Sequence, residues 1–563
     1  MNFIFGKNAG IGTSGTAWIW KFLFGAAVLA YCLAYSPYGI NETDGGFVTG
    51  LAWQVLSGKT LYDEVIYVRP PLTVWWRALE MSLLPEHGAV LWERWIFYLK
   101  VGAYSWLGAS VLAVGERRWM LATLGFVVSA HCYPPMAWHT VDGILFAVWG
   151  IWLWSKISAG WGAALAGIAM AASLLCKQSF YPMAVVFLWM LLLDKRWGRL
   201  SWGVAAFCLV FLCFFAYLKH NDLLLNYLQW TGGAASGSQA FQHGLLDYFR
   251  VKPILVLASL ACLPAVVWYF WKEKNLRIAK WAWVLWLFFL GAFYAYELLS
   301  ERRFVAPFAQ SRLLFWVGVV YVLWPVANFA KARAASVSIR MNAVAFFAAL
   351  NTRLLALLAV SWCASVSWGY NLPILFAVPW VFAAMDISRL FWTKGHPVRD
   401  GSWHRHWPGV VVVLALLGCF RLAYEFVYRD GRRGEMTAHL GDVFPALHGI
   451  YTTQEKMLLY RDLKNLAVRY PSFKTLPAFP QANFLTRTRP RLPLDWVVER
   501  EMGQNDALVL KNLKENEPVL FVEKTYAEKI KSDPEMRLTH EVMEQGIRLE
   551  ETVYFWVLSL KSR

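Results

Sequence analysis

Residues 159–194 read AGWGAALAGIAMAASLLCKQSFYPMAVVFLWMLLLD. Two apolar runs, at about 159–176 and 180–194, are separated by a short polar segment that contains Lys177. A helix of about 20 apolar residues crosses the hydrocarbon core of a bilayer, which is about 30 Å thick. The stretch therefore predicts two consecutive transmembrane helices, with Lys177 at the membrane surface between them.

Similar apolar runs recur along the chain and predict about thirteen transmembrane helices in all. Of the 563 residues, 58% are hydrophobic and 16% are charged, whereas soluble proteins carry about 25% charge. We therefore expect an all-α polytopic membrane protein whose first span is an uncleaved helix. The other expected spans are 18–35, 91–114, 119–135, 141–155, 201–218, 253–271, 280–298, 312–330, 353–369, 373–390 and 408–425.

The positions of Lys and Arg predict which side of the membrane each connection faces. Cytoplasmic connections carry an excess of these residues, and this explains the formal net charge of +17 without nucleic-acid binding. If the N-terminus is cytoplasmic, all the larger basic clusters fall on the cytoplasmic side. They lie at 116–118, 194–196, 272–280, 331–340 and 389–405. The segments then expected outside are 36–90, 136–142, 219–252, 299–311 and the C-terminal tail.

The first outer loop, residues 36–90, contains an apolar segment that we do not count as a span. Residues 70–84 include Arg77 and Glu80, and a span at this point would reverse every later connection. We expect amphipathic helices lying on the outer leaflet at 70–84 and at 46–57, each with one buried face.

The C-terminal tail, residues 428–563, has the composition of a soluble domain. The runs 518–522 and 552–558 are short, apolar and rich in β-branched or aromatic residues, which predicts buried strands. Residues 454–470 have the periodicity of an amphipathic helix. We therefore expect a small extracytoplasmic α/β domain after a transmembrane domain that covers residues 1–427.

Acidic and basic side chains occur together in the outer connections, where apolar helices do not need them. A carboxylate accepts a proton from a hydroxyl nucleophile, and Arg or Lys binds a phosphate and stabilises its charge as it leaves. The pattern therefore favours transfer to a hydroxyl group with a phosphate as leaving group. The acids are Glu42, Asp44 and Asp142, and the basic residues are Arg69, Lys177, Arg302 and Arg303.

The chain carries several short motifs whose order resembles that in the GT-C glycosyltransferase superfamily. The nearest branch is that of protein O-mannosyltransferases and lipid A aminoarabinose transferases. The remaining spans and the tail are similar to that superfamily in general layout only. The motifs are Asp44-Gly45-Gly46, Leu61-Tyr62-Asp63, Arg69-Pro70-Pro71-Leu72, Arg117-Arg118, His139-Thr140-Val141-Asp142 and Leu175-Cys176-Lys177.

The resemblance implies inverting transfer of a sugar from a polyprenyl-phosphate donor, outside the cytoplasm, in a bacterial inner membrane. The acceptor is a hydroxyl group on a glycan, a lipid or a protein. Asp44 matches the catalytic acid at the start of the first outer loop, and Asp142 matches the acid of the second. The family pattern has an Asp-Glu pair where this chain has Asp44-Gly45, so Glu42 stays an alternative base. Arg69 matches the basic residue that contacts the lipid phosphate.

Further candidates for substrate binding are Lys177, Arg302 and Arg303 as phosphate ligands, and Tyr62 and His139 as hydrogen-bonding groups. Simpler readings stay open for several candidates: Asp44 or Asp142 as a helix cap, Arg69 as a residue that reaches the membrane surface, and His139 as a packed side chain.

The sequence establishes no cofactor, and a divalent cation held by Glu42, Asp44 and Asp142 stays an alternative. A transporter or flippase for lipid or sugar is the main alternative function, for which buried charges near mid-membrane and two related halves are typical. A glycan ligase or polymerase that uses a diphosphate-linked donor is a second alternative, and a catalytically inactive sugar-binding relative is a third.

Overall fold

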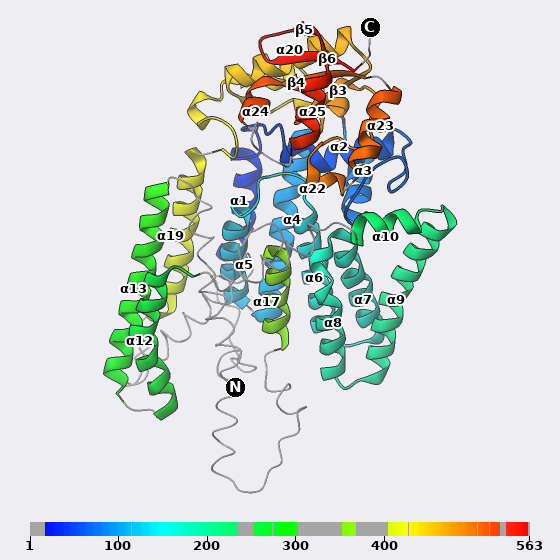
Figure 1. The fold of residues 1–563 in the computed structure, drawn as a ribbon. Helices are drawn as coiled ribbons and strands as arrows, with labels where there is room; N and C mark the ends of the chain where they lie inside the picture. The colour runs from blue at the N-terminus through cyan, green and yellow to red at the C-terminus, as the bar shows by residue number, and fades with distance from the viewer. Residues whose placement is uncertain are drawn as a thin grey trace.

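A computed structural model shows a layer of long helices beneath a smaller mixed layer formed by the end of the chain (Figure 1). Three described helices are long and apolar enough to cross a membrane, with apolar segments at Ala17–Ala34, Trp197–His220 and Leu276–Phe293. The structure describes residues 17–113, 115–232, 251–272, 275–301, 352–366, 403–425, 427–503, 505–516, 518–529 and 536–560.

The expected spans that fall on described residues coincide with helices, whereas those at 312–330 and 373–390 lie outside the described part. A total of about thirteen spans therefore remains a prediction. The helices are α1 (Ala17–Ala34), α4 (Ala89–Leu112), α5 (Gly115–Ala130), α6 (His139–Lys156), α7 (Gly160–Cys176), α8 (Pro182–Leu193), α9 (Trp197–His220), α12 (Pro253–Lys272), α13 (Leu276–Glu301), α17 (Thr352–Ser365) and α19 (Trp403–Glu425).

Helix α7 packs closely against α9 where Gly167 of α7 meets Gly203 of α9. A Cβ atom added to Gly167 of α7 would lie 2.3 Å from the carbonyl oxygen of Gly203 of α9. Helices in membranes associate through such small residues, since lipid gives no hydrophobic driving force between them. The polar segment at Lys177, with the short η2 (Gln178–Phe180), ends α7 on the side of the mixed layer.

The first outer loop forms η1 (Asp44–Gly46), α2 (Phe47–Leu56) and α3 (Leu72–Leu83), so both expected helices are present. Helix α2 is buried on nearly every side instead of on one face. The reason is that α21 (Ala482–Thr486) and the preceding loop cover it: a Cβ atom on Gly50 would lie 2.3 Å from the carbonyl oxygen of Pro480.

Helix α3 does have two distinct faces. Trp76, Leu79 and Leu83 are exposed, as expected for side chains that meet lipid at the membrane surface. Arg77 and Glu80 face inward and form ion pairs with residues of α4. Arg77 and Glu80, the charged residues that argue against a transmembrane span at 70–84, therefore anchor α3 to the helix layer.

The mixed layer contains a four-stranded sheet in the order β3-β4-β6-β5. Strands β3 (Phe473–Leu476) and β4 (Val519–Glu523) are parallel, and β6 (Phe555–Ser559) pairs antiparallel with β4 and β5 (Ile547–Glu551). The predicted strands at 518–522 and 552–558 correspond to β4 and β6, and the predicted helix at 454–470 is α20 (Gln454–Arg469). The layer also contains α22 (Glu499–Met502), α23 (Asp506–Asn516), α24 (Lys524–Lys529) and α25 (Arg537–Gln545). Strands β1 (Ala438–His439) and β2 (Tyr451–Thr452) form a separate two-stranded sheet.

Within the described residues, two clusters of buried apolar side chains join the first outer loop to the C-terminal region (residues 427–560). One cluster of buried side chains joins Leu51 and Tyr67 of the loop to Trp496 and Met502 of the C-terminal region. Backbone hydrogen bonds add to this contact, for example from Ile66 N to the Pro493 carbonyl at 2.8 Å. The C-terminal region is thus fixed to the first outer loop, at one end of the helix layer (Figure 1).

Candidate functional site

Arg69 lies in the first outer loop between α2 and α3, directly before the Pro pair that precedes α3, and is 9% exposed. Its two Nη atoms donate to the two carboxylate oxygens of Glu501 at 2.5 and 2.6 Å. The guanidinium carbon also lies 5.5 Å from the centre of the Phe47 ring. Such a two-point contact holds the guanidinium plane in one orientation.

Tyr62 fixes the backbone of this loop. It adopts a left-handed conformation, with φ of 70°, and its carbonyl accepts a hydrogen bond from Asn226 at 2.7 Å. Its hydroxyl donates to the carbonyl oxygen of Arg69 at 2.6 Å. The structure therefore places Tyr62 as a residue that positions Arg69.

Lys177 lies between α7 and η2 and is 5% exposed. Its Nζ donates to the hydroxyl of Thr140, in the first turn of α6, at 2.9 Å. Burial, together with the positive charge of Arg69, lowers the pKa of Lys177 to about 7, against the opposing effect of Glu501. An anion close to Lys177 would restore its charge.

His139 occupies the first position of α6, where it contacts two residues of the first outer loop. Its Nε2 atom lies 2.6 Å from the hydroxyl of Tyr67, and its ring lies 6.1 Å from the Phe47 ring, centre to centre. The shared neighbour Phe47 thus brings His139 and Arg69 to one place. The structure joins four of the predicted site residues, Tyr62, Arg69, His139 and Lys177, in a group that we call the basic cluster.

Asp44 begins η1, three residues before Phe47, and is 5% exposed. The hydroxyl of Tyr428 donates to Asp44 Oδ2 at 2.9 Å, and an Nη atom of Arg429 lies 3.1 Å from the same oxygen. The side chain does not cap α2, because the N-cap of α2 is Gly46, without a side-chain hydrogen bond. The capping interpretation of Asp44 is therefore wrong.

Glu42 lies two residues earlier, and its carboxylate accepts a hydrogen bond from Lys456 of α20 at 2.9 Å. Burial raises the pKa of Glu42, and the positive charge of Lys456 opposes this rise. The C-terminal region therefore supplies a basic partner to both Glu42 and Asp44.

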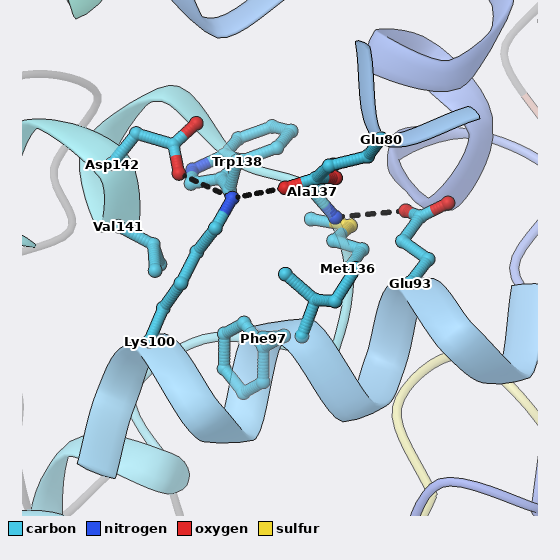
Figure 2. Close-up of a pocket in the computed structure, with 10 residues that line it drawn as sticks. Glu80, Glu93, Phe97, Lys100, Met136, Ala137, Trp138, Val141 and Asp142 are labelled. Carbon is cyan, nitrogen blue, oxygen red and sulfur yellow. Dashed lines mark hydrogen bonds and ion pairs between the residues drawn. The ribbon is translucent and has the colours of Figure 1, made fainter. Parts of the chain in front are cut away.

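Asp142 takes part in a chain of ion pairs between α3, α4 and α6, at a small pocket beside the basic cluster (Figure 2). Lys100 of α4 lies 2.8 Å from both Asp142 and Glu80. Burial acts to raise the pKa of Glu80, but Lys100 and Arg77 outweigh it and lower that pKa. Asp142 is thus a buried carboxylate with a fixed counter-ion, and it does not cap α6, whose N-cap is Trp138 without a side-chain hydrogen bond.

Glu93, which also lines the pocket in Figure 2, takes part in a second ion pair. Arg77 lies 2.6 Å from Glu93, and the other oxygen of Glu93 accepts a hydrogen bond from the backbone N of Ala137 at 2.8 Å. This contact fixes the connection between α5 and α6, from which His139 and Thr140 follow.

A cation held jointly by Glu42, Asp44 and Asp142 does not fit the described residues. Each of the three carboxylates already has a basic partner, namely Lys456, Arg429 and Lys100. Within the described ranges, no group of three or more His, Cys, Asp or Glu side chains is arranged to hold a metal ion. Arg302 and Arg303 lie outside the described residues.

No protein-family model matches the chain, and no curated protein matches it either. The fold is similar to that of the apo oligosaccharyltransferase of Archaeoglobus fulgidus, with a TM-score of 0.46 and 12% identity over 94% of this chain and 73% of that one. It is also similar to apo ArnT of Cupriavidus metallidurans, with a TM-score of 0.35 and 13% identity over 97% and 99%.

Several residues at the site were not predicted from the sequence. Glu501, Tyr428, Arg429 and Lys456 belong to the C-terminal region and meet the first outer loop across more than 380 positions of sequence. Lys100 has a local signal, because an ionisable residue within an apolar span is a candidate for a functional or paired position.

Proposed function

We propose that this protein is a membrane glycosyltransferase that moves a sugar from a polyprenyl-phosphate donor to a hydroxyl acceptor on the extracytoplasmic side of a bacterial inner membrane. The observation that supports this proposal most is the basic cluster, where Arg69 and Lys177 are both buried at the outer ends of the helices. In the donor-free protein Glu501 balances the charge of Arg69, whereas the hydrogen-bond partner of Lys177 is the neutral Thr140. Burying a cation is costly unless an anion compensates it, so the cluster favours a bound anion.

The basic cluster has the chemistry of a phosphate site. Arg69 offers a planar pair of N–H donors that matches two oxygens of a phosphate. Lys177 adds a donor whose hydrogen-bond partner, Thr140, is neutral. Tyr67 and His139 supply further polar groups at 2.6 Å from each other. A lipid phosphate reaches this position from the membrane without leaving the surface of the bilayer.

Asp44 is the proposed base. It accepts the proton of the acceptor hydroxyl while the hydroxyl oxygen attacks the anomeric carbon, and the bond from that carbon to the phosphate oxygen breaks. The electron pair of this bond goes to the phosphate, whose charge Arg69 and Lys177 stabilise. The transition state has oxocarbenium character, and attack opposite the leaving group inverts the anomeric centre.

The position of Asp44 relative to the basic cluster suits these roles. Asp44 and Phe47 are separated by two residues within η1 and the start of α2, and the Phe47 ring contacts both Arg69 and His139. Tyr428 and Arg429 hold one oxygen of the carboxylate, Oδ2. In this proposal Glu42 and Asp142 are the alternative bases.

The test is transfer of radiolabelled sugar from a panel of polyprenyl-phosphate donors, with purified protein and a membrane extract as acceptor. We expect Asp44→Asn to lower kcat by about 10²- to 10⁴-fold, as for loss of a general base. Asp222→Asn, an exposed acid between α9 and α10 (Leu224–Gly232), is the matched control and should retain activity. Equal transfer by wild type and Asp44→Asn would move the base to Glu42 or Asp142. Absence of transfer from every donor would favour the transporter.

A further inference from the structure

Glu501 reaches the basic cluster from α22, in the C-terminal region, and is 3% exposed. Both of its oxygens contact Arg69, at 2.5 and 2.6 Å. It is the residue through which the C-terminal region enters the proposed phosphate site.

The segment that carries Glu501 is short and is fitted against the loop that carries Arg69. Helix α22 has four residues and ends at Gly503, which has φ of 57°. A Cβ atom on Gly503 would lie 2.8 Å from a methyl carbon of Val68, the residue before Arg69. The two segments are thus in direct contact, and Glu501 is aligned with the guanidinium group by this packing.

A carboxylate on the two Nη atoms of Arg69 has the same two-oxygen geometry as a phosphate on these atoms. The edge of the guanidinium formed by the two Nη atoms donates to one such two-oxygen partner at a time. Resting on the proposed function, we propose that Glu501 is an internal competitor of the lipid phosphate: it occupies Arg69 in the donor-free protein, and donor binding displaces it together with α22.

The charges of the basic cluster support displacement instead of joint binding. With Glu501 on Arg69, the charge of the guanidinium is already balanced, and the phosphodiester of a donor brings one further negative charge. Two anions in contact at a buried position repel each other strongly. Release of Glu501 towards water at the edge of the C-terminal region removes this repulsion. It also opens the C-terminal cover of the site when the donor arrives.

The first experiment measures binding of undecaprenyl phosphate to the detergent-purified full chain by quenching of Trp fluorescence. We expect Glu501→Gln, which keeps the shape and removes the charge, to bind about tenfold more tightly than wild type, the scale of one charge-assisted hydrogen bond. The control is Glu499→Gln, on the same helix, whose carboxylate faces Arg537 at 3.2 Å; it should bind as wild type does. Unchanged or weaker binding by Glu501→Gln would overturn the proposal, and weaker binding would make Glu501 a positioning residue for Arg69.

The second experiment needs no variant and follows backbone hydrogen exchange of wild type with and without undecaprenyl phosphate. We expect exchange in peptides that cover residues 498–503 to rise at least about threefold on binding, while exchange in β4 stays constant. Equal or slower exchange at 498–503 would contradict displacement. These measurements separate the inference from the proposed function: faster exchange without any sugar transfer keeps the competition at Arg69 and rejects only the transfer reaction.

Discussion

Lys100 of α4 and Asp142 of α6 form a buried ion pair, with 2.8 Å between Nζ and Oδ1. The same Nζ atom lies 2.8 Å from Glu80 of α3, so one ammonium group joins three helices (Figure 2). Because Asp142 follows His139 and Thr140 within one turn of α6, this ion pair also fixes the helix end on which the basic cluster depends.

Replacement of Lys100 by Met should destabilise the protein strongly. The change removes the counter-ion that the buried carboxylates of Glu80 and Asp142 share. Loss of one partner of a buried ion pair lowers the free energy of unfolding by about 3–5 kcal/mol. We expect a lower midpoint of thermal unfolding in detergent. Lys219→Met, at an exposed position near the end of α9, is the matched control and should unfold as wild type does.

The double variant Lys100→Met, Asp142→Asn separates loss of the charge pair from loss of packing. If the pair itself matters, removing the charge of Asp142 recovers part of the lost stability, since only Glu80 then lacks its Lys partner. A double variant that is less stable than Lys100→Met alone would instead assign the effect to other contacts of Asp142.

Gly167→Ala should disrupt the contact between α7 and α9. The new methyl group would lie 2.3 Å from the Gly203 carbonyl oxygen, so that the helices must separate, and such overpacking costs about 1–3 kcal/mol. Gly198→Ala on α9 has no atom within 4 Å of the new methyl group and serves as control. Thermal unfolding of both variants checks this prediction, and equal midpoints would mean that the two helices do not approach each other so closely.

The local parts of the fold were predictable because they depend on local patterns. A helix in lipid pairs its own backbone groups, and the apolar runs therefore mark α1 or α7 without knowledge of their neighbours. The same is true of β4 and β6, which are short apolar runs, and of α20, which has the periodicity of an amphipathic helix. Strand β3 was not predicted, because its four residues are buried as part of a parallel pair with β4 and carry no alternating pattern.

The site was predictable only in part, for the same physical reason. Arg69, His139 and Lys177 each lie beside a helix end on one side of the predicted topology, so the sequence already indicated that they meet. Glu501 comes from a segment 432 positions after Arg69, and no local pattern marks it as a partner. The burial of α2 was also missed, since its cover comes from α21 and Pro480.

Arg69→Lys should raise the KM for the donor by about tenfold, with a smaller effect on kcat. Lys keeps the charge but loses the planar pair of donors that binds two phosphate oxygens, a difference of the order of one charge-assisted hydrogen bond. Arg487→Lys, which affects a surface contact to Glu86, is the control. The change to Lys also weakens the ion pair with Glu501, so the comparison is repeated in the Glu501→Gln protein. If Arg69→Lys leaves the KM for the donor unchanged there, Arg69 does not bind the phosphate directly.

Donor binding should weaken as the pH rises through about 7, the value to which burial and the charge of Arg69 lower the pKa of Lys177. Below this pH Lys177 is already protonated and attracts the phosphate. Above it the side chain is neutral in the free protein, so binding must take up a proton, and the affinity falls by up to about tenfold per pH unit. A sugar phosphodiester keeps one charge across this range and does not itself add a pH dependence.

The measurement is the Kd of a donor that supports transfer, determined between pH 6 and 9 for wild type, Lys177→Arg and Lys177→Met. Arg stays protonated over this range, and Lys177→Arg should therefore bind with little dependence on pH. Lys177→Met should bind weakly at every pH, because it lacks the charge in both states. If the donor affinity falls with pH in the same way in all three proteins, the titrating group is not Lys177, and Lys177 does not belong to the phosphate site.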